Sequence, residues 1–336
     1  MHMLPFPFRA VEELDLGPKW QAVFEEKWPH YRAWFLREGE AARPSYATSV
    51  RMLRAHMPEL MPVYERVVEL AGGGDLAARM LSLYRPPPYL AACSQGAWTR
   101  DGGPVLVRNY DYAPSRFEGM LWHTRLLDRR VIGMSDCLWG LLDGMNDDGL
   151  AMSLTFGGRR VLGDGFGIPI VIRYVLETCS TVDDVRATLA RLPYSLSHNV
   201  TAVDRGGRVL TAYLSPDREP IFREFPAATN HQGIVEWPEQ ARATRTIERE
   251  QTIVQLLEDP SIDVDAFADS FLRAPLFSTS YAHGFGTLYT TTYRVAVGEV
   301  DLRWPAHTWH HGFDAFDEGH HTEVLAEPSL DATTTA

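Results

Sequence analysis

A run of three prolines, Pro86-Pro87-Pro88, divides the chain into two parts of different character. Consecutive prolines cannot continue a helix and favour an extended backbone, so this run marks a structural boundary. The residues before it, from about 10 to 82, repeat with the period of helices, whereas those after it form short strand-like segments. The chain is therefore predicted to begin with a helical segment and to continue as a mixed α and β unit.

The clearest helical period lies between residues 20 and 35. Trp20, Phe24, Trp28, Tyr31 and Phe35 recur at intervals of three and four residues, which places them on one face of a helix. An exposed aromatic face of this size would reduce solubility, so we expect it to pack on the rest of the protein. The alternative is that this face forms a module for binding a partner.

Strand-like segments follow the prolines and are separated by turn residues. Asp101-Gly102-Gly103 is a hairpin turn signal between the first two strands. Strands are predicted at residues 91–99, 104–112, 122–127, 137–142, 150–156, 200–204, 209–213, 287–295 and 299–304. Helices are predicted at residues 169–179, 182–192 and 242–257. This order is typical of an α+β protein and not of a parallel βαβ sheet.

The charge balance argues against several classes of partner. Asp and Glu total 44 against 32 Lys and Arg, a net charge of −12, and no dense basic run offers a footprint for nucleic acid. An acidic chain also gains nothing from an anionic membrane surface. No apolar run approaches the ~18–20 residues that span a bilayer. Glu12, Glu13 and Asp15 interrupt the start of the chain before a signal peptide could form. We therefore expect a cytoplasmic protein that binds neither nucleic acid nor membranes.

Three cysteines are too few for a disulfide framework, and they lack the CxxC spacing of a zinc site. Cys137 and Cys179 lie in apolar surroundings, which predicts core positions. Cys93 differs, because it lies in the first strand of the predicted hairpin, within reach of charged residues on the second strand.

The hairpin can bring a thiol, a guanidinium and a carboxylate together. With the loop at residues 101–104, Cys93 lies opposite Tyr112 and shares its face with Arg108, while Asp111 joins them only after a bulge or a one-residue slip. A cationic neighbour favours the thiolate, which is the nucleophilic form. The alternative is a small buried Cys93 beside a surface ion pair of Arg108 and Asp111.

Four segments, in order, resemble the motifs of N-terminal-nucleophile (Ntn) hydrolases. Cys93 with Val107-Arg108-Asn109-Tyr110-Asp111 resembles the Cys…RNxD signature of that superfamily. Three later segments resemble its N-x-x-G-L-A strand, its TNH motif and its Ser/Thr-Arg pair: Asn146-Asp147-Asp148-Gly149-Leu150-Ala151, Thr229-Asn230-His231 and Thr244-Arg245. The most similar branches are the isopenicillin N acyltransferase (acyl-coenzyme A:6-aminopenicillanic acid acyltransferase, peptidase C45) family and the penicillin V acylase/bile salt hydrolase group. The resemblance spans residues 93 to about 304.

This resemblance implies a fold and a domain organisation. The expected fold is a four-layer αββα Ntn-hydrolase sandwich preceded by a helical N-terminal segment. Residues 1–92 would be a helical leader, residues 93–325 the catalytic core and residues 326–336 a flexible tail.

The resemblance also implies a mechanism. The Cys93 thiol would attack the Ala92 carbonyl, so that the precursor cleaves itself and Cys93 becomes N-terminal. The new α-amino group, with an ordinary pKa of about 7.7–8.0, would then act as the base for its own thiol. The implied catalytic residues are Cys93, Arg108, Asp111, Asn230 and Arg245. Asn230 and a backbone N–H near Leu154 or Thr155 would stabilise the oxyanion.

The implied substrate is a small acyl donor, an amide or a thioester, with water or an amine as acceptor. No cofactor or metal is expected, although a coenzyme A thioester is a candidate donor. The leader is expected to stay bound to the core after cleavage. Two features depart from the family: Thr155 stands where acylases often have Asn, and Tyr89-Leu90-Ala91-Ala92 does not match the family's cleavage junction closely.

Two further functions compete with this one. The C-terminal histidines, with Asp314 and Asp317, could bind a divalent metal in a metal-dependent hydrolase, although a polar loop explains them as well. These histidines are His307, His310, His311, His320 and His321. The second competitor is an unprocessed binding or partner-interaction protein on the same fold, which would tolerate Cys93→Ala. His231 is interpreted as structural, because the asparagine motif explains its position.

Overall fold

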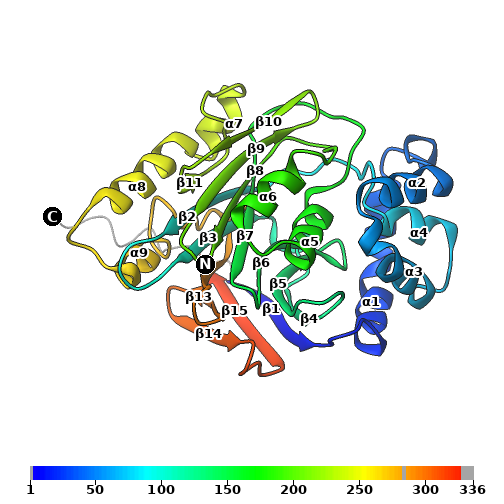
Figure 1. Ribbon diagram of the computed structural model, residues 1–336, viewed down its shortest axis with the longest axis horizontal. Helices are drawn as coiled ribbons and strands as arrows, with labels where there is room; N and C mark the ends of the chain where they lie inside the picture. The colour runs from blue at the N-terminus through cyan, green and yellow to red at the C-terminus, as the bar shows by residue number, and fades with distance from the viewer. Residues whose placement is uncertain (1–2, 282–284, 327–336) are drawn as a thin grey trace.

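The computed structural model describes residues 3–281 and 285–326. Two β-sheets lie face to face, and each carries helices on its outer face, so the layers run α, β, β, α (Figure 1). The helices of residues 18–81 form a lobe at one end of this sandwich. The predicted α+β sandwich with a helical N-terminal segment is confirmed.

The larger sheet has nine strands in the order β10-β9-β8-β7-β6-β5-β4-β1-β15. Its strands are β1 (Met3–Glu12), β4 (Met120–Thr124), β5 (Val131–Asp136), β6 (Gly140–Asn146), β7 (Leu150–Phe156), β8 (His198–Asp204), β9 (Val209–Ser215), β10 (Arg218–Arg223) and β15 (Gly319–Ala326). Neighbouring strands are antiparallel except β1 and β4, which run parallel.

The smaller sheet has six strands in the order β11-β2-β3-β12-β13-β14. Its strands are β2 (Ala92–Trp98), β3 (Val105–Tyr112), β11 (Ala227–Ala228), β12 (Gly286–Arg294), β13 (Glu299–Trp304) and β14 (His307–Gly312). The predicted hairpin is the pair β2–β3, and every residue of both strands is buried. It lies inside the sheet because β11 and β12 flank it.

Helices cover the outer face of each sheet. On the larger sheet, α5 (Ile168–Thr178) packs on β6 and β7, and α6 (Val182–Leu189) packs on β8 and β9. On the smaller sheet, α8 (Thr246–Glu258) packs on β2 and β11, preceded by α7 (Pro238–Ala243) and followed by α9 (Val264–Ser270). Thr181 and Asp184 form a reciprocal capping box at the start of α6, which satisfies backbone N–H groups that have no partner inside the helix.

The N-terminal lobe contains the expected helices. They are α1 (Pro18–Phe35), α2 (Tyr46–His56), α3 (Met61–Leu70) and α4 (Asp75–Leu81). Trp20, Phe24 and Phe35 are buried in the main core, which confirms that the aromatic face of α1 packs on the protein.

Besides its helices, the expected helical leader of residues 1–92 contributes a strand, β1, to the larger sheet. β1 lies between β4 and β15, with Phe6, Phe8 and Ala10 buried at alternating positions. Pro5 and Pro7 have no backbone N–H to donate, so they do not suit a strand that is paired on both sides. In β1 they are tolerated because β4 pairs only with residues 9–12, and β15 is the single partner of β1 at the two prolines. The leader is thus part of the larger sheet.

Several other elements differ from expectation. The strand predicted at residues 137–142 begins at Gly140, because Cys137 and Leu138 have positive φ angles of 57° and 76° and form the turn from β5 to β6. The elements β5, β10, β14, β15 and α9 were not predicted from the sequence. The predicted tail, apart from Ala326 at the end of β15, lies outside the described residues.

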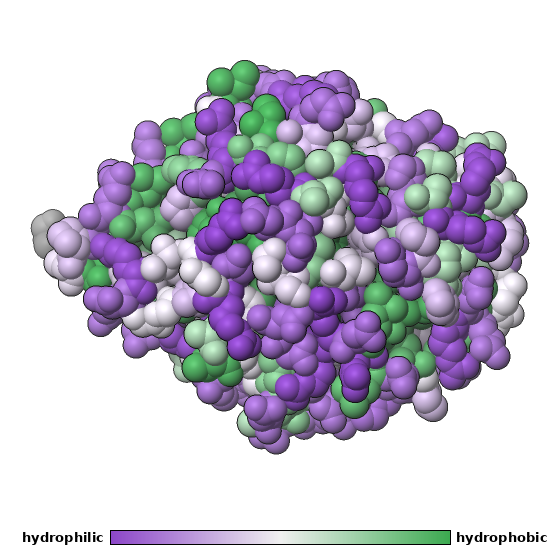
Figure 2. Space-filling view, in the orientation of Figure 1, coloured by the Kyte–Doolittle hydropathy of each residue, from purple (hydrophilic) through white to green (hydrophobic). Residues whose placement is uncertain are grey.

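The hydrophobic core fills the space between the sheets, and a second cluster lies between the smaller sheet and its helices. Trp98 and Val107 of the sheet meet Phe267 and Phe271 there. Figure 2 shows a largely hydrophilic face with small, scattered hydrophobic groups. Across residues 3–281 and 285–326, no helix is long and apolar enough to cross a membrane.

Candidate active site

The register of the β2–β3 hairpin decides which residues share a face with Cys93. Trp98 pairs with Val105, so Cys93 lies opposite Tyr110 and not opposite Tyr112 as predicted. The shift of two residues preserves the alternation of faces, and Arg108 is on the Cys93 side as expected. This side faces the larger sheet, because Gln95 hydrogen-bonds Thr201 of β8.

The Cys93 thiol is buried against the Arg108 guanidinium. Arg108 Nη2 lies 3.3 Å from Cys93 Sγ and donates to the Leu154 carbonyl at 3.2 Å. Both side chains are completely buried. Burial raises the pKa of the Cys93 thiol, while Arg108 opposes that rise by favouring the thiolate. In the intact chain the thiol is therefore protonated at neutral pH. The Arg108 cation lies beside it and can stabilise the thiolate when that forms.

Arg108 is held from behind by Asp143, a residue that sequence reasoning missed. Arg108 Nη1 donates to Asp143 Oδ2 and, at 2.7 Å, to the Tyr289 hydroxyl. Tyr289 and Tyr293 both donate their hydroxyls to the Asp143 carboxylate, the former at 2.6 Å. Asp143 lies on β6, opposite Cys93 across the sandwich. The signal was a single carboxylate within an otherwise uncharged strand, Gly140–Asn146.

Asp111 lies on the other face of β3, toward α8. The β2–β3 register contains no bulge, so Asp111 does not reach the Cys93 thiol. Its carboxylate accepts from Arg249 Nη1 at 2.7 Å and from the Thr287 hydroxyl at 2.6 Å. Burial raises the pKa of Asp111, and the Arg249 cation opposes this rise.

Arg249 joins Asp111 to Cys93 through Asn230. Arg249 Nη2 donates to Asn230 Oδ1 at 2.6 Å, and the same oxygen accepts the Cys93 backbone N–H at 3.1 Å. The thiol of Cys93 thus faces Arg108 while its nitrogen is held by the Asn230–Arg249–Asp111 group. Four of the five predicted catalytic residues meet here: Cys93, Arg108, Asp111 and Asn230.

Arg245 is not brought to this site, and Arg249 occupies the expected place of the arginine. Arg245 precedes the first turn of α8 with φ of 50°, and its guanidinium pairs with Glu248 in solvent at 2.5 and 2.7 Å. Arg249 lies one turn further on and points inward. The sequence did offer a signal that Arg249 is buried. It lies four residues before Ile253, which the helical pattern placed on the apolar face of the helix.

The segment that carries Asn230 is fixed by hydroxyl groups. Thr155 Oγ1 donates to the Thr229 carbonyl at 2.5 Å, and Asn230 N donates to Thr246 Oγ1 at 2.7 Å. Asn230 Nδ2 donates to the Phe156 carbonyl at 3.2 Å. The Thr155 side chain therefore anchors this loop, and Leu154 presents its carbonyl to Arg108. The oxyanion role of these residues remains a prediction.

His231 and the two other cysteines occupy structural positions. His231 contacts Thr246 at 3.0 Å and Glu250 at 3.2 Å, away from Cys93. Cys137 and Cys179 are buried and free, as expected.

The C-terminal histidines pack with aromatic rings. Within the described part of the chain, no group of three or more His, Cys, Asp or Glu side chains is arranged to hold a metal ion. The His307 and His321 rings stack with centroids 4.1 Å apart, and His310 pairs with Asp301 at 2.7 Å. His311 is buried beside Phe316. This donor set does not support the metal-dependent alternative.

Comparison with known proteins finds a matching family model. The family model for acyl-coenzyme A:6-aminopenicillanic acid acyl-transferase matches residues 98–309. No curated protein sequence matches the chain significantly.

Three solved structures are similar at 13% sequence identity. Penicillin V acylase from Agrobacterium tumefaciens has a TM-score of 0.48 over 66% of this chain and 86% of its own. A variant of the conjugated bile acid hydrolase from Clostridium perfringens has a TM-score of 0.43 over 71% and 100%. The Caenorhabditis elegans ortholog of N-acylethanolamine-hydrolyzing acid amidase has a TM-score of 0.46 over 68% and 98%.

Proposed function

Because this chain belongs to the acyl-coenzyme A:6-aminopenicillanic acid acyl-transferase family, we propose that it is a self-processing cysteine enzyme with Cys93 as nucleophile. Acyl transfer or amide hydrolysis is the chemistry of this family and of the Ntn type. One observation carries the assignment of the nucleophile: Cys93 is held at both ends, its thiol by Arg108 at 3.3 Å and its nitrogen by Asn230 at 3.1 Å.

Self-processing begins at the Ala92–Cys93 bond. The Cys93 sulfur adds to the Ala92 carbonyl carbon, the C–N bond breaks, and the thiol proton goes to the departing nitrogen. The product is a thioester between Ala92 and Cys93. Water then hydrolyses this thioester, which leaves a carboxylate on Ala92, a free thiol and a free α-amino group on Cys93. Arg108 stabilises the sulfur while it carries negative charge.

Turnover uses the same atoms. The α-amino group of Cys93 takes the thiol proton, and the thiolate attacks the carbonyl carbon of the acyl donor. The amine or thiol leaving group receives a proton as the acyl thioester forms. Asn230 and a backbone N–H at Leu154 or Thr155 stabilise the oxyanion, a contribution of about 3–4 kcal/mol per donor. Arg249, paired with Asp111, fixes Asn230, and the Asp111 carboxylate balances the charge of the α-ammonium group.

The donor is an amide or a thioester, including a coenzyme A thioester, and the acceptor is water or an amine. No cofactor or metal takes part in these steps. The leader stays bound after cleavage, because β1 is paired with β4 and β15 inside the larger sheet. A cytoplasmic location completes the proposal, supported by three cysteines that are all free.

Intact mass under denaturing conditions tests the proposal. The wild-type protein should give two fragments whose masses sum to the 37.9 kDa chain plus one water, with the larger fragment beginning at Cys93. Cys93→Ala should give a single species, and Cys179→Ala, which removes a buried cysteine elsewhere, should cleave like the wild type. A single wild-type species would contradict self-processing and favour the unprocessed binding protein. Cleavage in Cys93→Ala would instead show that Cys93 is not the nucleophile that cleaves the chain.

A further inference from the structure

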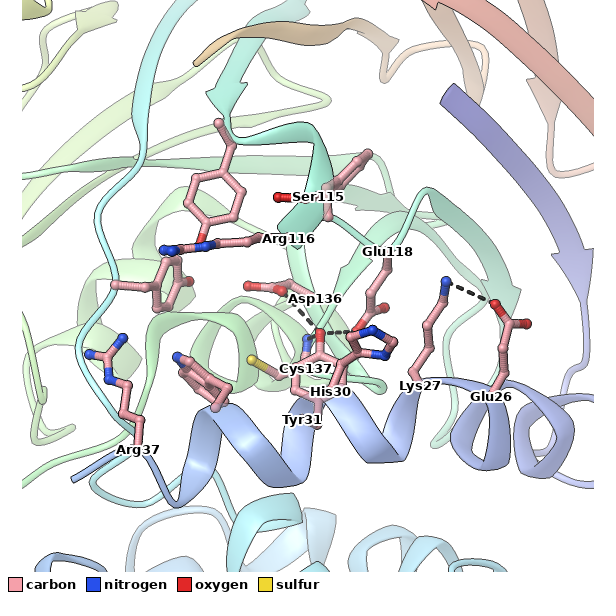
Figure 3. Close-up of a pocket in the computed structure, with 14 residues that line it drawn as sticks. Glu26, Lys27, His30, Tyr31, Arg37, Ser115, Arg116, Glu118, Asp136 and Cys137 are labelled. Atoms are coloured by element: carbon pink, nitrogen blue, oxygen red, sulfur yellow. Dashed lines mark hydrogen bonds and ion pairs between the residues drawn. The ribbon is translucent and has the colours of Figure 1, made fainter. Parts of the chain in front are cut away.

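A cavity of about 520 Å³ lies between the leader and the catalytic core. Helix α1 forms one wall, and the opposite wall comes from the segment after β3 and the turn after β5 (Figure 3). This volume lies within the usual range of small-molecule sites. Neither the leader nor the core encloses the cavity alone.

The walls of the cavity are a chain of aromatic rings. Tyr31 and Trp34 of α1 lie edge to face with centroids 6.0 Å apart, Trp34 and Tyr89 are 6.4 Å apart, and Tyr89 and Tyr112 are 6.2 Å apart. Phe117 also contributes an aromatic ring to the lining. Aromatic rings that surround a site attract a cationic group bound there, because each ring face carries partial negative charge.

Two carboxylates lie at the floor of the cavity. Glu118 and Asp136 both accept from the Tyr31 hydroxyl, the latter at 3.4 Å (Figure 3). Glu118 also accepts from the Ser135 hydroxyl at 2.6 Å and the Leu138 N–H at 2.7 Å. Among the described residues, neither carboxylate forms an ion pair with Lys, Arg or His. Four basic side chains also line the cavity: Lys27, His30, Arg37 and Arg116. Lys27 of α1 pairs with Glu26 at 2.9 Å, and Arg37, which follows α1, donates to the Pro88 carbonyl.

The charge of this floor depends on pH. Burial, together with the negative charge of Glu118, raises the pKa of Asp136 to about 7. The groups that interact with Asp136 come from α1, the segment before β2, β3, the segment after β3 and its own turn: Tyr31, Tyr89, Tyr110, Tyr112, Glu118 and Cys137. Glu26, Lys27, His30, Arg37 and Arg116 line the same cavity. Burial raises the pKa of each of these tyrosines and of Cys137, so they stay neutral. Above neutral pH the floor therefore holds negative charge that no cation among the described residues balances through an ion pair.

The cavity lies one layer of rings from the nucleophile. Tyr110, which pairs with Cys93, has its ring 5.6 Å from Tyr112 and 5.5 Å from Phe117, both of which line the cavity. The Arg108 guanidinium lies over the Tyr110 ring, 4.6 Å from its centroid. A ligand in the cavity is thus placed beside the residues that contact the thiol.

We propose that this cavity binds the protonated amine of an apolar or aromatic substrate, with Asp136 and Glu118 facing the ammonium group and the rings enclosing it. As a statement about substrate, this proposal rests on the proposed function of Cys93. The ammonium group is not the reacting amine, because an acceptor must be unprotonated to attack the acyl-enzyme. Tyr31 and Trp34 belong to the leader, so the leader contributes directly to specificity.

Calorimetric titration of the full-length Cys93→Ala variant tests binding separately from catalysis. The probes are 2-phenylethylammonium and its neutral counterpart 2-phenylethanol, compared at about pH 8, where an alkylammonium keeps its charge. The ammonium probe should bind about ten-fold tighter or more. Adding Asp136→Asn should reduce that preference, because Glu118 alone then faces the ammonium group, and adding Trp34→Leu should weaken ammonium binding.

The control is Asp164→Asn, a change of the same kind at an exposed carboxylate outside the cavity, which should leave both affinities unchanged. Lowering the pH from about 8 to about 6 should weaken ammonium binding, because Asp136 takes up a proton while the probe stays charged. Equal affinity for the two probes, no binding of either, or a preference that Asp136→Asn leaves unchanged in a folded protein would overturn the proposal. Cleavage of the wild-type chain, measured by mass, reports on the Cys93 mechanism independently of this result.

Discussion

Arg249→Gln is expected to destabilise the fold strongly, whereas Arg245→Gln, one helical turn earlier, is expected to have almost no effect. The Arg249 and Asp111 side chains are 4% and 2% exposed, with Nη1 and Oδ2 2.7 Å apart. Arg245 is 55% exposed and pairs with Glu248, itself 51% exposed. Arg245 at the N-terminal cap of α8 and Arg249 in its first turns therefore give a comparison in which burial is the main difference.

The loss of stability in Arg249→Gln is set by the Asp111 carboxylate, which stays buried without its cationic partner. Removing Arg249 leaves the Asp111 carboxylate buried with the Thr287 hydroxyl as a partner, and breaking a buried ion pair from one side costs about 3–5 kcal/mol. The carboxyl group can escape part of this cost by taking up a proton. Its pKa, already raised by burial, rises further without the cation. Because the neutral form is then the stable one, the loss should be small in acid and should grow as the pH rises.

Urea denaturation in the Cys93→Ala background, where every variant remains one chain, measures this loss at about pH 8 and about pH 5. Arg249→Gln should lower the free energy of unfolding more at the higher pH. The double variant Arg249→Gln/Asp111→Asn should lose less than the sum of the two single losses, because it leaves no buried charge. Equal effects of the two arginine variants, or strictly additive losses, would refute the assignment of Arg249 to the site.

Three further predictions concern the same architecture. Asn230→Ala should keep a folded circular dichroism spectrum and slow Ala92–Cys93 cleavage about 10²–10³-fold by timed mass spectrometry, and an unchanged rate would mean that Asn230 does not serve the chemistry. The two cleaved fragments should co-elute in native size-exclusion chromatography and separate in denaturant, and loss of the leader under native conditions would contradict the role of β1. Burial lowers the pKa of His198 to about 4, so stability present above its ordinary pKa of 6.5 should be lost as the pH falls toward 4. That loss is worth about 3 kcal/mol, and His198→Gln should reduce it in urea titrations between these pH values.

The sequence predicted those features of the fold and of the site that depend on residues close together in the chain. The proline run, the helical period of α1 and the turn at Gly102-Gly103 act within a few residues, so the division into a helical leader and a strand-rich core could be predicted. The face of the β2–β3 hairpin on which each side chain lies could also be predicted, because alternate residues of a strand face the same side and an error of two residues in the register preserves this. Arg108 was therefore placed beside Cys93 despite an error of two residues.

Other parts of the site depend on contacts between distant segments. Asp143 and Cys93 lie on different sheets, and only the packing of one sheet on the other brings Arg108 between them. Arg245 and Arg249 differ in sequence by one helical turn, and the choice between them depends on how α8 is rotated against β2 and β11.

By itself, the sequence determined the two-part organisation, the hairpin that carries Cys93 and the segments that resemble an Ntn hydrolase. The tertiary structure decided that the leader supplies a strand to the larger sheet, that Arg249 holds Asp111 and Asn230, and that an aromatic cavity with two carboxylates at its floor lies between leader and core. The physical reason is the range of the interactions. Periodicity and turn chemistry act over a few residues, whereas buried charge pairs and cavities exist only after segments far apart in the chain have packed together.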